Sequence, residues 1–260
     1  ENGGCEARNS QNQVRTRQKR RASPARFNRW QKEFFIRSTG RTANNFEVNA
    51  GMFICFEGID GSGKTTQIKL LQEYLSQLSV EHIVVREPGG TKAGEEIRRI
   101  LLHSDFRLQP ESELLLFMAA RAQIVREVIR PALEKGLVVL ADRFMDSSLA
   151  YQGIGRSLGI EIVSTINGFA VGSTIPDITI YIDVPATEAV LRMRKEKKND
   201  KIEVESLEFF EKVRNGYMKI IREKLDNYEI VDGTRSMTEV HECIRNIVDR
   251  FLQRFRLNGR

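Results

Sequence analysis

Short apolar runs alternate with amphipathic segments along most of this chain. The run at 52–56 (MFICF) is continuously apolar, as expected of a parallel strand that is covered on both faces. Residues 68–78 then place Ile and Leu at helical spacing, and residues 83–85 form a second apolar run. Together the three segments predict a β-α-β unit.

The same alternation continues toward the end of the chain. Further strands are predicted at 137–141 and 178–182, with a weaker one at 228–231. Helical patterns are found at 97–102, 111–133, 160–169, 187–195, 206–224 and 237–255. Strands that alternate with helices are typical of parallel sheets. We therefore expect one α/β domain at 52–257, with a doubly wound, parallel five-stranded sheet flanked by helices.

Residues 1–51 differ from the rest of the chain in both pattern and charge. They show no sustained periodicity, and their 11 Lys and Arg against 4 Asp and Glu give a net charge of +7. The other 209 residues carry 30 against 31, a net charge of −1, so the overall charge of +6 comes from this segment. We interpret it as a basic, disordered tail.

Three explanations of the tail are open. It is dispensable or non-native sequence ahead of a start at Met52, an organelle-targeting segment, or a nucleic-acid-binding arm. The body favours a cytoplasmic enzyme, because Cys5, Cys55 and Cys243 have no CxxC spacing and no apolar run approaches the roughly 18 residues of a membrane span. Organelle import through the tail is the alternative location.

A glycine-rich motif follows the first predicted strand. Residues 58–65 (GIDGSGKT) match G-x4-G-K-[ST] in the required context, after a buried strand and at the start of a helix. The glycines let backbone N–H groups surround a polyphosphate, Lys64 can reach the β- and γ-phosphates, and Thr65 can hold Mg²⁺. The residues predicted to bind ATP are Gly58, Ile59, Asp60, Gly61, Ser62, Gly63, Lys64, Thr65 and Thr66.

A carboxylate follows the apolar run at 137–141. Asp142 is expected at the carboxyl end of its strand beside the glycine-rich loop, the position of a Mg²⁺-binding aspartate in P-loop proteins. A strand end or a helix cap is the simpler explanation of the same pattern.

The sequence has neither a guanine-reading N-K-x-D motif nor an ABC-type signature, which favours a small kinase. A nucleic-acid-associated P-loop ATPase that uses the basic tail is the alternative from another class.

Six ordered segments carry a resemblance to one family. They are FEGIDGSGKTTQ (56–67), REPGGT (86–91), LLFMAAR (115–121), DRFMDSSLAYQGIGR (142–156), IPDITIYIDV (175–184) and FFEKVRNGY (209–217). Through them, residues 52 to about 255 resemble the bacterial thymidylate kinase family. The resemblance implies a nucleoside monophosphate kinase fold with a short lid, ATP and Mg²⁺ for phosphoryl transfer, dTMP as acceptor and a homodimer. A kinase for another nucleoside monophosphate is the nearest alternative.

The predicted acceptor site draws on three of these segments. Phe117 and Arg121 are four positions apart on one helical face, so a ring and a guanidinium can meet one planar group. The resemblance assigns thymine stacking to Phe117 and a base-edge hydrogen bond to Arg121. It also implies phosphate contacts from Arg86 and Arg143, sugar contacts from Ser148 and Tyr151 that disfavour a ribose, and a wall completed by Gln152.

Transfer between two phosphates needs placement and charge neutralisation more than a strong base. The acceptor phosphate is already largely a dianion at neutral pH. Lys64 and Arg143 are therefore the cations expected at the transferring group. Asp60 matches an acidic position of the family's loop.

The lid is expected in the basic stretch at 192–204. Position 61 is glycine, whereas eukaryotic members of the family carry an arginine in the loop, so the lid should supply the cation. Lys201 stands where the bacterial members commonly have an arginine, and a lysine lacks the planar fork of donors. Arg192 or Arg194 is the expected substitute.

Overall fold

The computed structural model describes residues 51–196, 205–223 and 227–258. Residues 1–50 of the predicted tail and residues 197–204 of the predicted lid, which include Lys201, lie outside the described residues. Gly51, the last residue assigned to the tail, is buried and donates its N–H to the carbonyl of Leu133 at 2.7 Å. The described body therefore includes Gly51.

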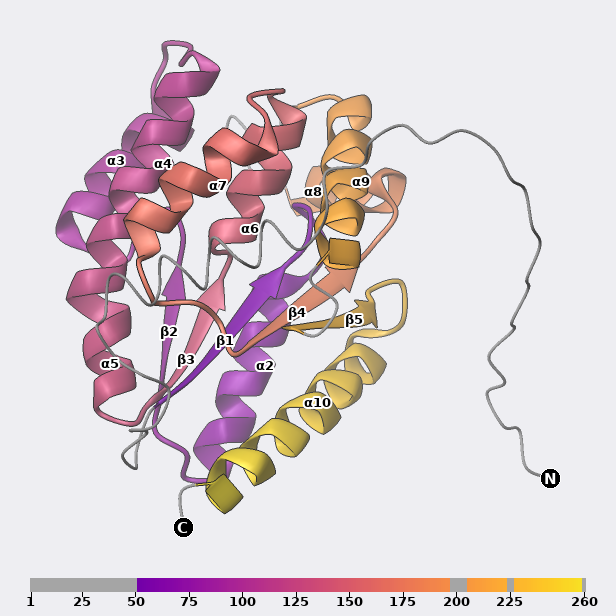
Figure 1. Cartoon of the computed structure of the whole chain (residues 1–260). Helices are drawn as coiled ribbons and strands as arrows, with labels where there is room; N and C mark the ends of the chain where they lie inside the picture. Colours follow the sequence, from indigo (N-terminus) through magenta and orange to yellow (C-terminus); the bar gives the residue numbers. More distant parts are fainter. Residues whose placement is uncertain (1–50, 197–204, 224–226, 259–260) are drawn as a thin grey trace, which may run out of the picture. The chain divides into compact units, whose positions relative to one another are not determined.

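Five parallel strands form one sheet in the described part of the chain (Figure 1). They are β1 (Met52–Glu57), β2 (His82–Arg86), β3 (Val138–Asp142), β4 (Ile178–Asp183) and β5 (Tyr228–Asp232). Their order is β2-β3-β1-β4-β5, which places β1 at the centre and confirms the predicted doubly wound sheet. The strand order reverses at β1, and open α/β sheets bind ligands at the carboxyl ends of the strands beside such a reversal.

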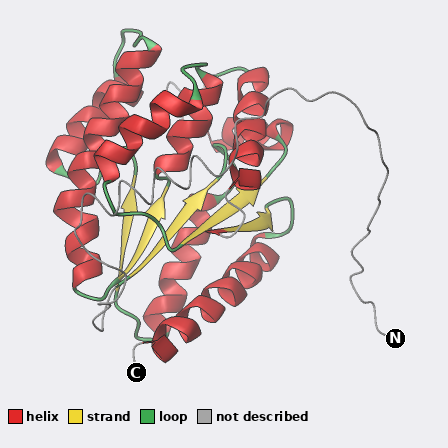
Figure 2. Cartoon of the chain, in the orientation of Figure 1, coloured by secondary structure: helices red, strands yellow, loops and turns green. Residues whose placement is uncertain are grey.

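Helices occupy most of the chain between the strands (Figure 2). The α-helices are α2 (Lys64–Gln77), α3 (Lys92–His103), α4 (Pro110–Ile124), α5 (Arg130–Glu134), α6 (Met145–Ser148), α7 (Ile160–Val171), α8 (Ala186–Glu196), α9 (Leu207–Glu223) and α10 (Met237–Asn258), and the π-helices are η1 (Val125–Ile129) and η2 (Leu149–Gly155). Every helix predicted from the pattern is present. No helix among the described residues is long and apolar enough to cross a bilayer.

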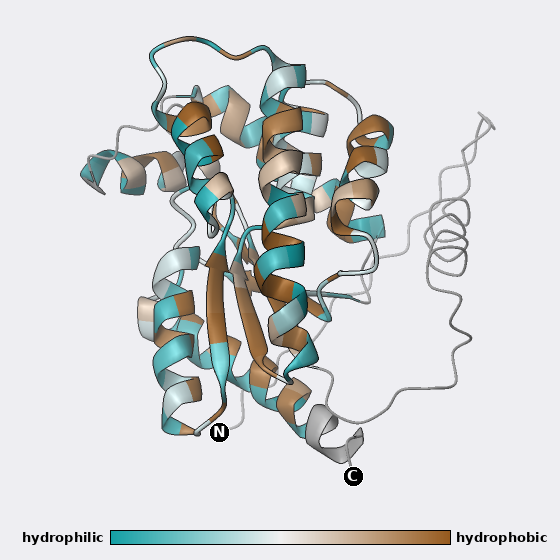
Figure 3. Cartoon of the chain, turned by 90° about the vertical axis from the view of Figure 1, so that its left-hand side faces the viewer, coloured by the Kyte–Doolittle hydropathy of each residue, from teal (hydrophilic) through white to brown (hydrophobic). Residues whose placement is uncertain are grey.

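The sheet separates two apolar layers. Along β1, Met52, Ile54 and Phe56 join a core shared with α2 and α10, whereas Phe53 and Cys55 join a core shared with η1 and α5. Figure 3 shows the brown strands between helices that carry teal, hydrophilic residues. Burial on both faces explains why this strand is continuously apolar and does not alternate with polar residues.

The long helix predicted at 111–133 is irregular. It runs as α4, η1 and α5 without a break, and its middle part is π-helical. Pro131 in α5 has no N–H to donate, and helices depart from regular hydrogen bonding around such residues. The apolar pattern predicted the extent of this segment but carries no signal for the wider turn.

The segment formed by α6 and η2 was not predicted. Its residues 145–153 are buried on all sides, and they pack against α7 and α9. A helix that is buried all round shows no amphipathic period, and the serines and glycines of this segment resemble a loop in composition. This segment carries Ser148, Tyr151 and Gln152 of the predicted acceptor site.

The central position of β1 leads to a stability prediction. Ile54 in β1 is fully buried, at 0% exposure, whereas Ile230 in the edge strand β5 is 48% exposed. We expect Ile54→Ala to lower the free energy of unfolding by about 2–5 kcal/mol, because a cavity forms in the core. The same change at Ile230 should cost less than about 1 kcal/mol. Urea denaturation of both variants tests this, and equal losses would contradict it.

Candidate active site

A cleft of about 900 Å³ lies where β1, β2 and β3 end. Its lining contains nine Lys and Arg against three Asp and Glu. The basic residues are Lys64, Lys69, Arg86, Arg98, Arg121, Arg143, Arg192, Lys195 and Arg235, and the acidic residues are Asp60, Glu87 and Asp142. The chain beyond the tail is nearly neutral, so the fold concentrates positive charge here, which favours polyanionic ligands.

The loop between β1 and α2 holds the side chain of Lys64. Its Nζ donates to the carbonyls of Gly58 and Ile59, at 3.1 and 3.0 Å, and to Ser62 Oγ at 3.4 Å. Burial, together with the charge of Arg143, lowers the pKa of Lys64 to about 8 despite nearby carboxylates. The ammonium group is therefore bound by neutral oxygens that charged phosphate oxygens can replace.

The backbone of this loop explains its glycines. Residues 60–66 line the cleft, whereas Gly58 and Ile59 lie behind the lining. Gly61 has a φ of +77°, and a Cβ there would lie 2.4 Å from the carbonyl oxygen of Ala189 in α8. A side chain at position 61 would collide with α8. The loop itself therefore cannot carry the arginine found in eukaryotic members of the family.

Thr65 and Asp142 lie together beside the loop. The Thr65 hydroxyl donates to Asp142 Oδ2 at 2.6 Å, from the first turn of α2 to the end of β3. Both groups are hard oxygen ligands, and Mg²⁺ usually takes one or two such protein ligands beside water and phosphate oxygens. The pair fits a magnesium site of that kind. No group of three or more His, Cys, Asp or Glu at metal-binding spacing occurs among the described residues.

Asp60, Arg143 and Tyr151 form one cluster facing the loop. Arg143 Nη2 donates to Asp60 Oδ1 at 2.5 Å, and the Tyr151 hydroxyl donates to Asp60 Oδ2 at 2.6 Å. Burial acts to raise the pKa of Asp60, but Arg143 and Lys64 outweigh it and the pKa falls below its ordinary value. Asp60 is therefore a carboxylate at neutral pH. It ties the loop to the segment after β3.

Arg121 is buried on the opposite wall of the cleft. It forms an ion pair with Glu87 at 2.5 Å and contacts the ring of Phe144. Its other acceptors are Ser148 Oγ at 3.0 Å, Asn167 Oδ1 at 2.6 Å and the carbonyl of Phe144 at 2.9 Å. Every nitrogen of this guanidinium thus donates to a protein oxygen. Phe117, one helical turn earlier, also lines the cleft.

The remaining predicted acceptor residues differ in burial. Gln152 is buried and donates to Glu113 Oε1 at 2.8 Å. Arg86 ends β2 and is 58% exposed, with Glu95 at 3.5 Å as its ion-pair partner. Both line the cleft, as Ser148 does. Ser148 accepts a hydrogen bond from Arg121 and therefore lies beside the residue that was predicted to contact the base edge.

The described part of the lid contributes α8. Arg192 lines the cleft, where its Nη2 donates to the carbonyl of Gly233 at 2.9 Å and pairs with Glu188. Lys195, one turn later, also lines the cleft. Arg194 is exposed and does not line the cleft. Of the two predicted substitutes for the lid cation, the structure brings only Arg192 to the cleft.

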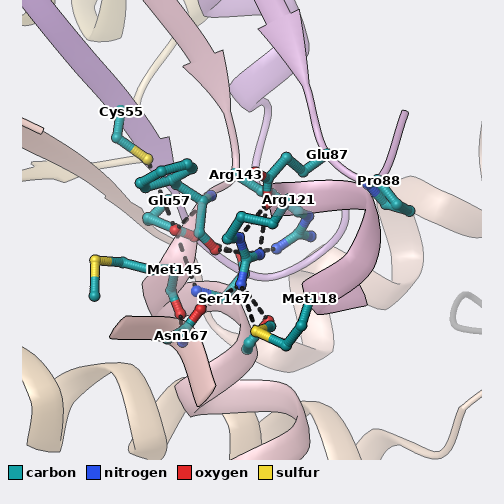
Figure 4. Close-up of polar contacts among 12 residues, drawn as sticks. Cys55, Glu57, Glu87, Pro88, Met118, Arg121, Arg143, Met145, Ser147 and Asn167 are labelled. Carbon is teal, nitrogen blue, oxygen red and sulfur yellow. Dashed lines mark hydrogen bonds and ion pairs between the residues drawn. The ribbon is translucent and has the colours of Figure 1, made fainter. Parts of the chain in front are cut away.

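Several residues of the site were missed in the sequence. Glu57, Glu87, Ser147 and Tyr217 are buried and bind the side chains of Arg121 or Arg143 directly or through one hydroxyl. Figure 4 draws the first three of these residues with both arginines. All four fall inside the six family segments, but their spacing alone gave no signal. Arg98, which lines the cleft and donates to the carbonyl of Pro88 at 2.8 Å, falls outside those segments.

A parallel sheet centred on β1, a phosphate-binding loop at the end of that strand and a second basic wall in the same cleft define a P-loop nucleoside monophosphate kinase. The family model for thymidylate kinase matches residues 56–244. The chain belongs to the thymidylate kinase family.

Individual relatives agree with this assignment. The thymidylate kinase of Kosmotoga olearia is 58% identical over 193 residues, which cover 74% of this chain and 93% of the relative. That of Thermosipho africanus is 52% identical, over 78% of this chain and 100% of the relative. A crystal structure of the thymidylate kinase from Ehrlichia chaffeensis is 34% identical with a TM-score of 0.64, over 77% of this chain and 99% of that chain. The resemblance read from the six segments is confirmed.

The pKa of Lys64 leads to a prediction on nucleotide affinity. Phosphate oxygens around Nζ stabilise the charged form, so binding of ATP raises this pKa above the value of about 8 in the free protein. Binding should then take up a proton, and the affinity should fall roughly tenfold per pH unit above pH 8. Isothermal titration calorimetry with a non-hydrolysable ATP analogue at pH 7, 8 and 9 measures this.

Lys64→Arg is the matched control, because a guanidinium keeps its proton throughout this range. Its affinity should change less between pH 8 and 9 than that of the wild type. If the variant binds too weakly, proton uptake by the wild type in two buffers of different ionisation enthalpy decides the question. An equal slope for both proteins, or no proton uptake, would contradict the assignment.

Proposed function

We propose that this chain transfers the γ-phosphoryl group of ATP to dTMP, giving dTDP and ADP for dTTP biosynthesis. The carrying observation is that one cleft is lined both by a polyphosphate loop and by Arg143, Tyr151, Arg121 and Phe117. Membership of the thymidylate kinase family supports the acceptor. A nucleic-acid-associated ATPase would depend on residues 1–51, and nothing in the described cleft favours it.

The donor site consists of the loop and the start of α2. Backbone N–H groups of residues 60–66, which line the cleft, and the side chain of Lys64 bind the phosphates of ATP. Thr65 and Asp142 would hold Mg²⁺, for which their paired oxygens are suited. A metal ion held there would supply positive charge to the phosphates of ATP. Lys64 adds a second positive charge on the protein side.

The acceptor phosphate is bound by Arg143, with Arg86 as the second contact. Both arginines line the cleft beside Asp142, and each offers a fork of N–H donors that matches a phosphate edge. Asp60 orients Arg143 through their ion pair. The acceptor phosphate then lies next to the loop that holds the donor, which is the placement that transfer requires.

The base and sugar are recognised on the opposite wall. Phe117 stacks on thymine, and Arg121 shares one of its N–H groups with the base edge, held in place by Glu87. Ser148 lies beside Arg121 and completes this contact, and Gln152 closes the wall. Tyr151 is fixed by Asp60 and crowds the position of a ribose 2′-hydroxyl. These contacts favour a deoxyribonucleotide.

The reaction proceeds by placement and charge neutralisation. The acceptor dianion attacks without a strong base, so the residues serve to hold two phosphates in line and to offset the charge that spreads over the transferring group. Arg192 is the lid cation that the described residues support, with Lys195 as a further candidate. Arg194 is less suited, because it is exposed and lies off the cleft.

The tail and the location complete the proposal. The catalytic domain spans residues 52–257, and residues 1–51 are dispensable for activity. The enzyme works in the cytoplasm, which is consistent with free thiols at Cys55 and Cys243.

We propose a homodimer that associates through α4 and α7. These helices pack against each other, and Leu115, Ile162 and Phe169 on them are exposed, Phe169 by 78%. Exposed large apolar residues on adjacent elements are typical of interfaces.

Light scattering after gel filtration should give a mass near twice 29.8 kDa for the wild type and a lower mass for Phe169→Glu. Leu78→Glu, an exposed leucine at the end of α2, is the control, and equal masses for both variants would contradict this interface.

The proposed reaction is tested with a panel of acceptors. ATP- and Mg²⁺-dependent diphosphate formation should be fastest, as kcat/KM, with dTMP when dUMP, UMP, CMP, AMP and GMP are compared. Lys64→Ala should lower the rate by roughly 10³-fold, because a charge on the transferring group is lost. Lys135→Ala, remote from the cleft, should not change it. A protein that begins at Met52 should keep full activity.

Two results would overturn the proposal. One is an equal or higher kcat/KM with another monophosphate, which would change the acceptor. The other is ATP hydrolysis that DNA stimulates without turnover of any acceptor, which would place the protein in a different class.

A further inference from the structure

The side chain of Glu57 is the least exposed charged group beside the cleft. Glu57 ends β1 and has 0% exposure, so the loop and the sheet cover it completely. Its Oε1 accepts from the N–H groups of Phe144 and Ser147, at 3.0 and 3.1 Å. Its Oε2 accepts from Ser147 Oγ at 2.6 Å and from the Tyr217 hydroxyl at 2.8 Å. Figure 4 shows Glu57 with dashed lines, among the labelled residues Cys55, Ser147 and Arg143.

The groups around Glu57 are donors that an ionised carboxylate can accept from. Two backbone N–H groups and two hydroxyls surround the two oxygens, and a thiol at Cys55 lies 3.7 Å from Oε1. A carboxylate accepts from all of them, whereas a carboxylic acid would need one hydroxyl to turn and accept. Burial raises the pKa of Glu57, and the bonds from Ser147 and Tyr217 with the charge of Arg143 oppose this rise.

The two hydroxyls connect Glu57 to Arg143. Arg143 Nη1 lies 3.1 Å from Ser147 Oγ and 3.4 Å from the Tyr217 hydroxyl. A hydroxyl that donates its one proton to Glu57 has only lone pairs left for Nη1. Glu57 therefore fixes the direction of both hydroxyls, and they accept from the guanidinium. In the described part of the chain Glu57 forms no direct hydrogen bond with Arg143, so it acts through these two hydroxyls.

Glu57 also holds the backbone on which Arg143 stands. Arg143 has a φ of +72°, a left-handed conformation that is unfavourable for residues other than glycine. The N–H of Arg143 donates to the carbonyl of Phe56 at 3.0 Å, and the next N–H, of Phe144, donates to Glu57. The end of β1 thus holds both sides of this turn. Strained residues persist where their surroundings fix them, and they are frequent at functional sites.

We propose that Glu57 is a positioning residue for the acceptor phosphate, which orients the hydroxyls of Ser147 and Tyr217 so that they hold the guanidinium of Arg143. This inference rests on the proposed role of Arg143 in binding the phosphate of dTMP. A glutamate that only stabilises the fold would contribute equally to both substrates. A positioning residue affects the acceptor and leaves the binding of ATP unchanged.

Glu57→Gln is the first test, because it keeps the size and changes only the donors. If the new amide faces the hydroxyls, its N–H groups take their lone pairs and turn their protons toward Arg143. If it faces the backbone, its N–H groups oppose those of Phe144 and Ser147. In the first case Arg143 loses acceptors, and in the second the turn that carries Arg143 loses its two backbone bonds to Glu57. In both cases we expect the KM for dTMP to rise roughly tenfold, as for the loss of one bond to a charged group. The KM for ATP should stay within twofold of the wild-type value.

Tyr217→Phe is the second test and removes one hydroxyl from a fully buried ring. Like Glu57→Gln, it should raise the KM for dTMP. In the variant that carries both changes, the two increases should be less than additive, because both changes act on Arg143. Asp177→Asn is the matched control. Asp177 Oδ2 accepts from the N–H of Phe53 at 2.7 Å at the other end of β1, so this change can lower stability without changing either KM.

The outcomes separate the inference from the proposed function. Wild-type turnover of dTMP with an unchanged KM for dTMP in Glu57→Gln and Tyr217→Phe would overturn the inference alone. Equal rises in the KM for dTMP and for ATP would also overturn it. If Glu57→Gln does not fold, as judged by circular dichroism, Tyr217→Phe decides. If the wild type does not phosphorylate dTMP at all, the proposed function fails and the inference fails with it.

Discussion

A buried guanidinium needs an acceptor for each of its N–H groups, and this constraint organises the acceptor half of the cleft. Arg121 is almost completely buried, and removing it from water without partners would cost several kcal/mol. Its acceptors come from four places along the chain, and they are Glu87 directly after β2, Phe144 in the turn after β3, Ser148 in α6 and Asn167 in α7. One arginine side chain thereby holds these segments in a single arrangement.

Arg143 likewise holds segments together, here across the two halves of the cleft. Its partners in the loop, Asp60 and the carbonyl of Gly58, belong to the proposed donor site, and its partners Tyr151 and Ser147 belong to the acceptor side. The two phosphate sites are therefore parts of one rigid framework. This matters because phosphoryl transfer gains its rate from placement, and a loose acceptor arginine would lose it.

The charges in the cleft lower the pKa of a cationic group, Lys64, and of an anionic group, Asp60. Arg143 lowers the pKa of Lys64 and also that of Asp60, because a nearby positive charge disfavours a second cation and favours an anion. The nearby carboxylates of Asp142, Asp60 and Glu57 act in the opposite direction and raise the pKa of Lys64. Carboxylates offset part of the charge of the nine basic side chains in the cleft. Glu57 and Glu87 are buried, and Asp60 is partly buried.

The sequence by itself determined the sheet and the phosphate loop. A continuously apolar β1, the spacing of GIDGSGKT and the aspartate after β3 carry their meaning locally, since each depends on a few consecutive residues. The tertiary structure decided the rest. Residues 145–153 of α6 and η2 are buried on all sides and show no period. The network from Glu57 through Ser147 to Tyr217 joins residues up to 160 positions apart, and only the turn of α8 separates Arg192 from Arg194. Hydrogen bonds between distant segments leave no spacing in the sequence, because folding alone brings their donors and acceptors together.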